Sequence, residues 1–405
     1  MSDHVPTPMQ RRAFIQTGAA TAAAVTLSST GTTSGQEPAP APAPGKAILP
    51  TRRLGKTGVD VTILNAGTLR IAGFMDRLLR LSFARGVRYY DTAKVYGSEP
   101  AFKKWFAEQP DVRKQIFLAT KQPVRSFGEV LKNIDERLSE LGTDYIDLLY
   151  YHGLGKNQVD WPKSKEMAAE IEAIKKTGKV KYVGFTTHDA TIAQQLDNAA
   201  AGNYVDVIML AYAPWLKKDS PLNKALDRCH EKNIGLIAMK LFAGRGALDR
   251  VKERMPTLKE RGLTPHQGLL HAAWSDERIA NVCIAMTNTD QLRENVEAAE
   301  KFQPLKAAQI EELRDAVLAS NPMMCANCDG SCSHAAGTKA ELGQLTRLLT
   351  YHDDFGARVL AREEYAALAD EQKDWRGADL EAARKACHSG LNFAKLLPEA
   401  DRLLG

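Results

Sequence analysis

Residues 116–152 read IFLATKQPVRSFGEVLKNIDERLSELGTDYIDLLYYH, and this stretch decides the fold class. It begins and ends with short apolar runs, at 116–120 and 146–152, which are typical of buried strands. Between them, apolar residues recur at 127, 130, 131, 134 and 138, the spacing of an amphipathic helix. We interpret Ser126 and Glu129 as a capping box at the start of this helix and Gly142 as its stop. The stretch therefore predicts a strand, a helix and a second strand.

The same alternation continues along the chain in both directions. Six further strand candidates, with helical patterns between them, lie at 62–67, 87–91, 180–186, 205–211, 234–239 and 282–286. Eight strand and helix pairs in about 250 residues fit a (β/α)8 barrel, the TIM barrel of the α/β class. A doubly wound sheet is the alternative, but no G-x-G-x-x-G motif follows the first predicted strand. We expect the barrel to span 47–305 and a mainly helical extension to span 306–405.

The composition is that of an ordinary globular chain with room for a large core. Of its 405 residues, 44% are hydrophobic and 25% are charged. The net charge of +5 is small, and its cations are interspersed with acids, so the sequence gives no support for nucleic-acid binding. No apolar run reaches the ~18 residues that a membrane span needs. We expect the folded part to be water-soluble.

The N-terminal segment is different. QRRAFIQTGAATAAAVTL, at 10–27, places Arg11 and Arg12 before a weakly apolar, alanine-rich run, and it resembles a twin-arginine export signal. The alternative is a disordered tail that contains two arginines by chance. We expect a signal at 1–36, an extended Pro/Ala-rich linker at 37–46 and export to the periplasm by the twin-arginine machinery.

Four polar residues stand at the ends of three consecutive predicted strands, where barrel enzymes carry their chemistry. Asp91 ends the strand at 87–91 and Tyr96 lies in the loop after it; Lys121 ends the next strand, and His152 ends the one that follows. Each alone has an ordinary explanation, such as a surface lysine or a hydrogen-bonded histidine. Together they predict a catalytic site.

These residues belong to motifs that resemble the aldo/keto reductase family. The motifs are RRLGKTGVDVTILNAGT at 52–68, DTAKVYG at 91–97, ATK at 119–121, YYHG at 150–153, IGLIAMKLFAGRG at 234–246 and AMTNTDQLREN at 285–295. The resemblance runs from Arg53 to Ala299. It implies NAD(P)H-dependent reduction of an aldehyde or ketone, or the reverse reaction. In that mechanism Asp91 fixes Lys121, Lys121 lowers the pKa of the Tyr96 phenol, Tyr96 gives a proton to the carbonyl oxygen, and a neutral His152 orients that oxygen.

The resemblance also implies a set of cofactor-binding residues: Thr68, Thr186, Thr187, Met209, Tyr212, Lys240, Leu241, Gly244, Arg245, Thr287, Asn288, Gln291, Glu294 and Asn295. Tyr212 is expected to stack on the nicotinamide. Met209 and Thr187 stand where relatives usually offer glutamine and asparagine to the carboxamide. Lys240 and Arg245 are phosphate-binding cations or solvated loop charges. The resemblance implies NADP(H) as the cofactor. NAD is the alternative, because Gln291 stands where many relatives that prefer NADPH carry an arginine, which would bind the 2′-phosphate far better.

The tail contains a cysteine motif, NPMMCANCDGSC at 321–332, with Cys325, Cys328 and Cys332 in the spacing C-x2-C-x3-C, and Cys387 further on. It resembles the ferredoxin-like extension of a bacterial subgroup of the family. The four thiols permit one [4Fe-4S] cluster. They also permit two disulfides in any of three pairings, or free thiols or a different metal, with zinc disfavoured. We interpret Cys229 and Cys283 as core residues of the barrel.

Three functional hypotheses follow from the sequence. The first is an exported oxidoreductase that interconverts a small aldehyde or ketone, which could be sugar-like, and its alcohol. The second is a redox relay in which an iron–sulfur cluster passes electrons between nicotinamide and a partner protein. The third is a non-catalytic binding barrel, but such a protein would gain nothing from keeping all four rim residues.

Overall fold

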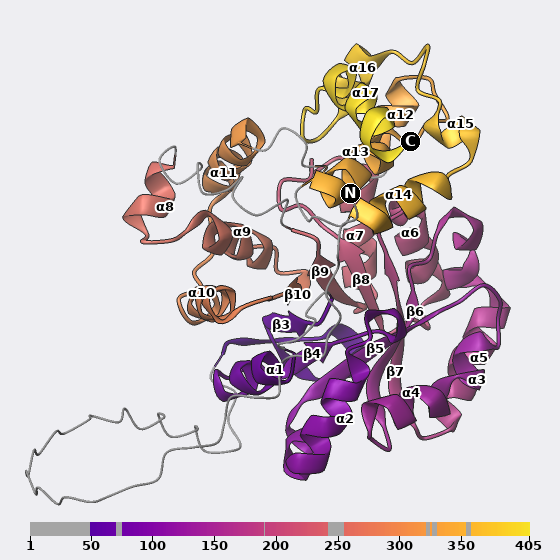
Figure 1. Ribbon diagram of the computed structural model, residues 1–405, viewed down its shortest axis with the longest axis vertical. Coiled ribbons are helices and arrows are strands. Elements are labelled where there is room, and N and C mark those ends of the chain that lie inside the picture. Colours follow the sequence, from indigo (N-terminus) through magenta and orange to yellow (C-terminus); the bar gives the residue numbers. More distant parts are fainter. Residues whose placement is uncertain are drawn as a thin grey trace, which may run out of the picture. The chain divides into compact units, whose positions relative to one another are not determined.

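The computed structural model describes residues 49–69, 75–189, 191–241, 255–320, 325, 330–353 and 358–405. All of them belong to one unit of the chain, Pro42–Gly405 (Figure 1). The predicted signal at 1–36 and linker at 37–46 lie outside the described residues, as do Gly244, Arg245 and Cys328. Among the helices in these ranges, none has the length and apolar character of a membrane span.

Eight parallel strands close into a barrel, which confirms the predicted (β/α)8 fold. Their order around the barrel is β10-β3-β4-β5-β6-β7-β8-β9. The strands are β3 Leu64–Gly67, β4 Tyr89–Asp91, β5 Phe117–Pro123, β6 Ile146–His152, β7 Val180–Thr187, β8 Val207–Ala211, β9 Gly235–Met239 and β10 Ile279–Ala285. Strands that are consecutive in the chain are also neighbours in the sheet. Asp91 of β4, Lys121 of β5 and His152 of β6 therefore lie on three neighbouring strands, toward their C-terminal ends.

Helices follow the strands and cover the outer face of the barrel (Figure 1). They are α1 Met75–Ala84, α2 Glu99–Glu108, α3 Glu129–Lys132, α4 Ile134–Leu141, α5 Lys165–Lys176, α6 Ile192–Gly202, α7 Pro221–Glu231, α8 Pro256–Glu260, α9 Pro265–Trp274 and α10 Thr289–Glu300. Side chains alternate across the strands, as the pleat of a strand requires. Tyr89 and Tyr150 belong to the core cluster inside the barrel, while their neighbours Tyr90 and Tyr151 pack in the layer between strands and helices.

A hairpin closes the N-terminal end of the barrel. Strands β1 Thr51–Arg53 and β2 Asp60–Thr62 pair antiparallel, and Leu54 and Val61 join the core inside the barrel. Gly55, in the turn, has a φ of +48°, and a Cβ there would lie 2.4 Å from the backbone nitrogen of Gly235. The turn therefore needs glycine, both for its backbone conformation and for its close approach to β9.

The helix predicted inside 116–152 is divided in two. Gly128, with a φ of +89°, precedes α3, and Asn133 separates α3 from α4. The capping-box interpretation of Ser126 and Glu129 is therefore wrong: the Ser126 hydroxyl donates to the Glu129 carboxylate instead, at 2.8 Å. Gly142 ends α4 in the left-handed conformation that the sequence predicted.

Helical segments form the C-terminal region. They are α11 Ala307–Ser320, α12 Ser331–Ala335, α13 Leu342–Asp353, α14 Arg358–Ala366, α15 Asp370–Lys373, α16 Leu380–Ala386 and α17 Phe393–Leu404. Leu313 and Val317 of α11 share a core cluster with residues of α8 and α9. Residues from α12 onward share a separate cluster, to which Leu345, Leu349 and Leu397 contribute. The tail thus has its own core beyond α11.

Candidate active site

Asp91, Tyr96, Lys121 and His152 lie together at the C-terminal rim of the barrel. Asp91 is the last residue of β4, and Tyr96 ends the short 3-10 helix that follows it, Lys94–Tyr96. His152 is the last residue of β6. Lys121 lies inside β5 rather than at its end, because β5 continues to Pro123. Its ammonium still reaches the rim because the aliphatic stem spans the remaining height.

Lys121 is the buried centre of the group. Its Nζ donates to the Asp91 carboxylate and, at 2.8 Å, to the carbonyl oxygen of Thr92. Burial alone would lower the pKa of Lys121, but the charge of Asp91 and the phenol of Tyr96 raise it above its ordinary value. Lys121 is therefore a permanent cation at neutral pH. Burial raises the pKa of Asp91, and the Lys121 charge opposes that effect.

Tyr96 lies against this cation. Lys121 Nζ is 4.9 Å from the centre of the Tyr96 ring. The sequence predicted a lowered pKa for this phenol. The structure gives the opposite net direction: burial raises the pKa of Tyr96 above 10, the Lys121 charge lowers it by less, and Asp91 raises it further. Tyr96 is therefore protonated at neutral pH and has a proton to give.

His152 completes the group. Its ring lies edge-on to the Tyr96 ring, with centroids 5.7 Å apart and planes at 86°. Burial, together with the charges of Lys121 and Lys240, lowers the pKa of His152 to about 3. The imidazole is neutral throughout the physiological range, so one of its nitrogens carries a hydrogen that can be donated to an oxygen.

Threonine and serine hydroxyls fix the loop after β4. Thr68 Oγ1 donates to the carbonyl oxygen of Asp91 at 3.0 Å and lies 2.8 Å from Ser98 Oγ, which in turn lies 2.6 Å from Thr92 Oγ1. All three hydroxyls are buried. Thr68, one of the expected cofactor contacts, thus has its hydroxyl engaged in holding Asp91 and the chain that leads to Tyr96.

The other expected contacts near the nicotinamide are packed into the protein. Thr186 Oγ1 accepts from the backbone nitrogen of Gly153 at 2.9 Å, and Thr187 Oγ1 donates to the carbonyl oxygen of Leu154 at 3.2 Å. Met209 lies in the core inside the barrel, and Leu241 in the core between strands and helices. The described residues at these positions thus offer few unused polar atoms to a carboxamide.

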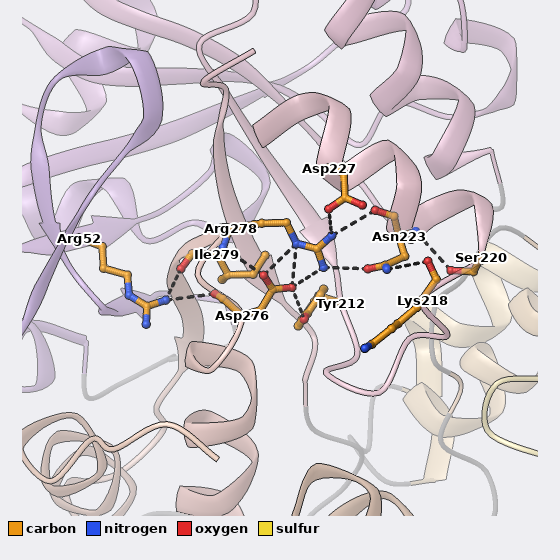
Figure 2. Close-up of polar contacts among 9 residues, drawn as sticks. All are labelled: Arg52, Tyr212, Lys218, Ser220, Asn223, Asp227, Asp276, Arg278 and Ile279. Atoms are coloured by element: carbon orange, nitrogen blue, oxygen red, sulfur yellow. Dashed lines mark hydrogen bonds and ion pairs between the residues drawn. The ribbon is translucent and has the colours of Figure 1, made fainter. Parts of the chain in front are cut away.

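Tyr212 is held by an ionic network (Figure 2). Its hydroxyl donates to Asp276 at 2.8 Å, and Asp276 also accepts from Arg278 at 2.6 Å. Arg278 reaches further to Asp227 at 2.6 Å and to Asn223 at 2.7 Å, both on α7. The Tyr212 ring is buried at the end of β8, and its orientation is set by this network.

The start of α10 suits the phosphate of a nucleotide. Asn288 caps the helix by accepting from the backbone nitrogen of Gln291 at 2.9 Å, and Gln291 Oε1 accepts from the backbone nitrogen of Thr287 at 2.8 Å. The first-turn N–H groups of a helix attract anions. Glu294 is turned toward α9, where it accepts from Thr264, and Asn295 is buried. The described end of β10 therefore fits a nucleotide cofactor at its phosphate end.

Lys240, which follows β9, is turned toward the tail. Its Nζ donates to the Tyr351 hydroxyl on α13 and lies 4.8 Å from the centre of that ring. Lys240 is half-buried, and burial lowers its pKa. The two other expected members of this loop, Gly244 and Arg245, lie outside the described residues.

The tail thiols come near one another. Cys325, Cys332 and Cys387 share the tail core, and a Cβ on Gly343 of α13 would lie 3.5 Å from Cys325 Sγ and 4.0 Å from Cys332 Sγ. Burial and the two neighbouring thiols raise the pKa of Cys332 to about 12. The described cysteines form no disulfide. No three metal-ligating side chains in the described ranges are grouped as a metal site, so the three described thiols alone do not fit a metal centre.

Three residues near the site were not anticipated. Cys283 of β10, interpreted as a core residue, lies beside the Asp91 carboxylate, and burial raises the pKa of its thiol. His188 follows β7 at the same rim. The sequence signal that could have identified it is its position just after the strand predicted at 180–186. Arg347 of α13 donates to the carbonyl oxygen of His188. No local pattern could have placed Arg347 there, because the two residues are far apart in the sequence.

A small cavity lies between β3, α1 and α10. It has a volume of about 10 Å³ and is lined mainly by apolar side chains, among them Leu78, Leu79, Met286 and Leu292. This is room for about one water molecule, far below the ~300 Å³ of a typical ligand site. The group of Asp91, Tyr96, Lys121 and His152, not this cavity, is the candidate active site.

Comparison with known proteins agrees with this geometry. Residues 74–281 match the model of the Aldo/keto reductase family. The chain is 26% identical to L-galactose dehydrogenase of Arabidopsis thaliana over 286 residues, covering 63% of this chain and 89% of that protein. It is 24% identical to L-glyceraldehyde 3-phosphate reductase of Escherichia coli (strain K12) over 325 residues, covering 64% and 91%.

A solved structure gives the same fold. The aldo-keto reductase AKR11C1 from Bacillus halodurans, in its holo form, matches with a TM-score of 0.54 at 22% identity, over 66% of this chain and 96% of that one. The family match covers β4 to β9, the strands that carry the four rim residues. The chain therefore belongs to the aldo/keto reductase family of oxidoreductases.

Proposed function

We propose that the protein reduces a small, oxygen-rich aldehyde or ketone with NAD(P)H, or catalyses the reverse oxidation. The observation that carries this proposal is the buried Lys121 ammonium, which is held between the Asp91 carboxylate and the Tyr96 phenol at the C-terminal rim. Relatives that act on L-galactose and on L-glyceraldehyde 3-phosphate support the substrate class. NADP(H) is the proposed cofactor, with NAD as the alternative.

In this mechanism each rim residue has a separate task. Tyr96 gives its proton to the carbonyl oxygen of the substrate, and His152 donates a hydrogen bond to the same oxygen. Lys121 stabilises the phenolate that Tyr96 becomes, and Asp91 holds the Lys121 ammonium in place. A bound nicotinamide would supply the hydride, and Thr287, Asn288 and Gln291 would hold the cofactor.

The assay that tests this proposal is NADPH consumption with glyceraldehyde across pH. The acid form of Tyr96 and the neutral form of His152 are both required. The pKa of Tyr96 is raised from its ordinary value, mainly by burial, and that of His152 is lowered to about 3, so neither shift moves a titration into the range between about pH 6 and pH 9. We expect kcat/KM for reduction to be flat across this range. A fall with a midpoint near pH 7 would contradict the assignment.

An iron–sulfur relay is the second candidate function. Cys325, Cys332 and Cys387 share the tail core, but they form no metal site among the described residues, so this candidate requires Cys328 as the fourth ligand. Iron and acid-labile sulfide in the anaerobically purified protein test this candidate. About four of each per chain would support it, and a colourless, iron-free protein that still reduces glyceraldehyde would exclude it.

We also propose that the protein works in the periplasm. Arg11 and Arg12, followed by the alanine-rich run, support export by the twin-arginine machinery. Cell fractionation checks this: an Arg11→Lys, Arg12→Lys variant should stay in the cytoplasm, whereas equal periplasmic recovery of the variant and the unaltered chain would contradict it.

A further inference from the structure

The rim carries a second polar group beside the catalytic one. Lys240 follows β9 and His188 follows β7, so both lie at the C-terminal ends of barrel strands. Both contact the tail helix α13: Arg347 donates to the carbonyl oxygen of His188, and Lys240 donates to the Tyr351 hydroxyl, one turn further along that helix. His152, the last residue of β6, lies at the same rim. In agreement with this placement, the Lys240 charge helps to lower the pKa of His152, and His152 helps to lower that of His188.

Lys240 is held in an uncommon conformation for a lysine. Its φ is +61°, in the left-handed region that residues with a side chain seldom adopt. In the described part of the chain no carboxylate forms an ion pair with its ammonium, and Glu364 of α14 acts on it only from a distance. Among the described residues, its ammonium donates to the Tyr351 hydroxyl. A half-buried cation that is not paired with a carboxylate can still bind an anion.

His188 carries a polar atom that the protein leaves unused. Its Nδ1 is buried and has no hydrogen-bond partner among the described residues. A buried polar atom without a partner costs stability unless a ligand or water supplies the bond. Arg347 of α13 fixes the backbone of this residue by donating to its carbonyl oxygen. Tail helix α13 thus contacts both residues, through Arg347 to His188 and through Tyr351 to Lys240.

Two cations, Lys240 and Arg347, act on His188. Lys240 and Arg347 both help to lower the pKa of His188, after burial, which is the largest cause. The one described carboxylate of the catalytic group, Asp91, is already bound to Lys121. A negatively charged group beside His152 would be attracted by these cations, and it could form a hydrogen bond with the His188 Nδ1 atom.

We propose that Lys240 and His188 form a subsite for an anionic group of the substrate, a carboxylate or a phosphate ester, and that Tyr351 positions Lys240 for it. The inference rests on the proposed function and narrows it to carbonyl compounds with an acidic group a few atoms from the C=O. It differs from the expectation that Lys240 binds a phosphate of the cofactor, since the Lys240 side chain points to α13 and acts on His152.

The test compares two aldehydes that differ only in the anionic group. Glyceraldehyde 3-phosphate and glyceraldehyde are reduced by the full-length holoenzyme and by its Lys240→Met variant, with kcat/KM measured for each. Lost charge-assisted hydrogen bonding should lower kcat/KM for the phosphorylated aldehyde by about 10- to 100-fold, and that for glyceraldehyde by less than about threefold. Lys218→Met, an exposed lysine on the loop after β8, makes the same charge change and should alter neither value.

Tyr351→Phe tests the positioning role. This variant keeps the ring and removes the hydroxyl that holds Lys240. We expect KM for glyceraldehyde 3-phosphate to rise by about three- to tenfold, with kcat and the neutral aldehyde unchanged. A general structural role would instead lower kcat for both aldehydes.

Two results would overturn the inference. One is an equal loss on both aldehydes in Lys240→Met; the other is a weaker Kd for NADPH that accounts for the whole loss, which would assign Lys240 to the cofactor. If the unaltered protein reduces neither aldehyde, the proposed function fails, and calorimetry with inorganic phosphate on the NADP⁺-saturated protein decides the subsite. Phosphate binding that Lys240→Met abolishes and Lys218→Met keeps would support it, and no binding would overturn it.

Discussion

The Tyr96→Phe variant is expected to lose nearly all turnover while still binding the cofactor. Phenylalanine keeps the ring that stacks edge-on against His152 and removes only the hydroxyl that carries the proton. General acid catalysis by a positioned side chain contributes about 10²- to 10⁴-fold, and kcat should fall by this factor. Steady-state kinetics measure the loss, and fluorescence titration with NADPH should give a Kd within about threefold of the unaltered value.

Tyr90→Phe is the matched control for that variant. It removes a hydroxyl from the same strand, but on the outer face, where Tyr90 contacts Ser82 at 3.1 Å and the carbonyl oxygen of Leu79 at 3.2 Å. We expect kcat to be unchanged. Full turnover by Tyr96→Phe, or an equal loss in both variants, would refute the assignment of Tyr96 as proton donor.

The Lys121→Met variant is expected to lose both activity and stability. Without the ammonium, Asp91 is left as a buried carboxylate whose ionic partner is gone, and breaking such a pair costs about 3 to 5 kcal/mol. The pKa of Tyr96 would also rise further, because burial and Asp91 both act in that direction and only Lys121 opposes them. Urea denaturation measures the free energy of unfolding, and we expect kcat to fall by at least about 100-fold.

Two further variants separate these effects. Lys94→Met removes a partly exposed lysine whose ion pair with Glu136 lies at the surface, the two side chains being 36% and 45% exposed, so the free energy of unfolding should change by about 1 kcal/mol or less. The double variant Asp91→Asn, Lys121→Met removes both buried charges and should regain part of the lost stability without regaining activity. If Lys121→Met is as stable as the unaltered protein, the buried pair does not have the role described here.

The fold could be predicted from sequence because its signals are local. Each strand is an apolar run and each helix has its own periodicity, and the order of strands in a barrel follows the order in the chain. The joint position of Asp91, Lys121 and His152 followed from that order alone. The division of the helix at Asn133 was missed because Gly128 and Asn133 adopt backbone conformations that the apolar spacing does not report.

The other features that the sequence did not predict depend on burial and on contacts between residues far apart in the chain. The sequence placed a cation beside Tyr96 and so predicted a lowered pKa. It could not show that burial raises this pKa by more than the Lys121 charge lowers it, so the predicted direction was wrong. The contacts of Arg347 with His188 and of Tyr351 with Lys240 join residues that are more than a hundred positions apart. They depend on how the tail packs, which no motif near residue 350 encodes.

The hairpin at the N-terminal end of the barrel also affects when the chain can fold during synthesis. Arg52 donates to the carbonyl oxygens of Asp276 and Ile279, at 3.2 and 2.8 Å (Figure 2). Lys56 donates through its backbone nitrogen to the carbonyl oxygen of Asn233 at 2.5 Å. Arg52 and Asp276 are 224 positions apart in the chain. At about 5–20 residues per second, the ribosome needs about 11 to 45 seconds to make this stretch. The hairpin is made before the barrel strands, and its contact with Asn233 can form once that residue is made, but the Arg52 contacts cannot form until the chain has reached Ile279.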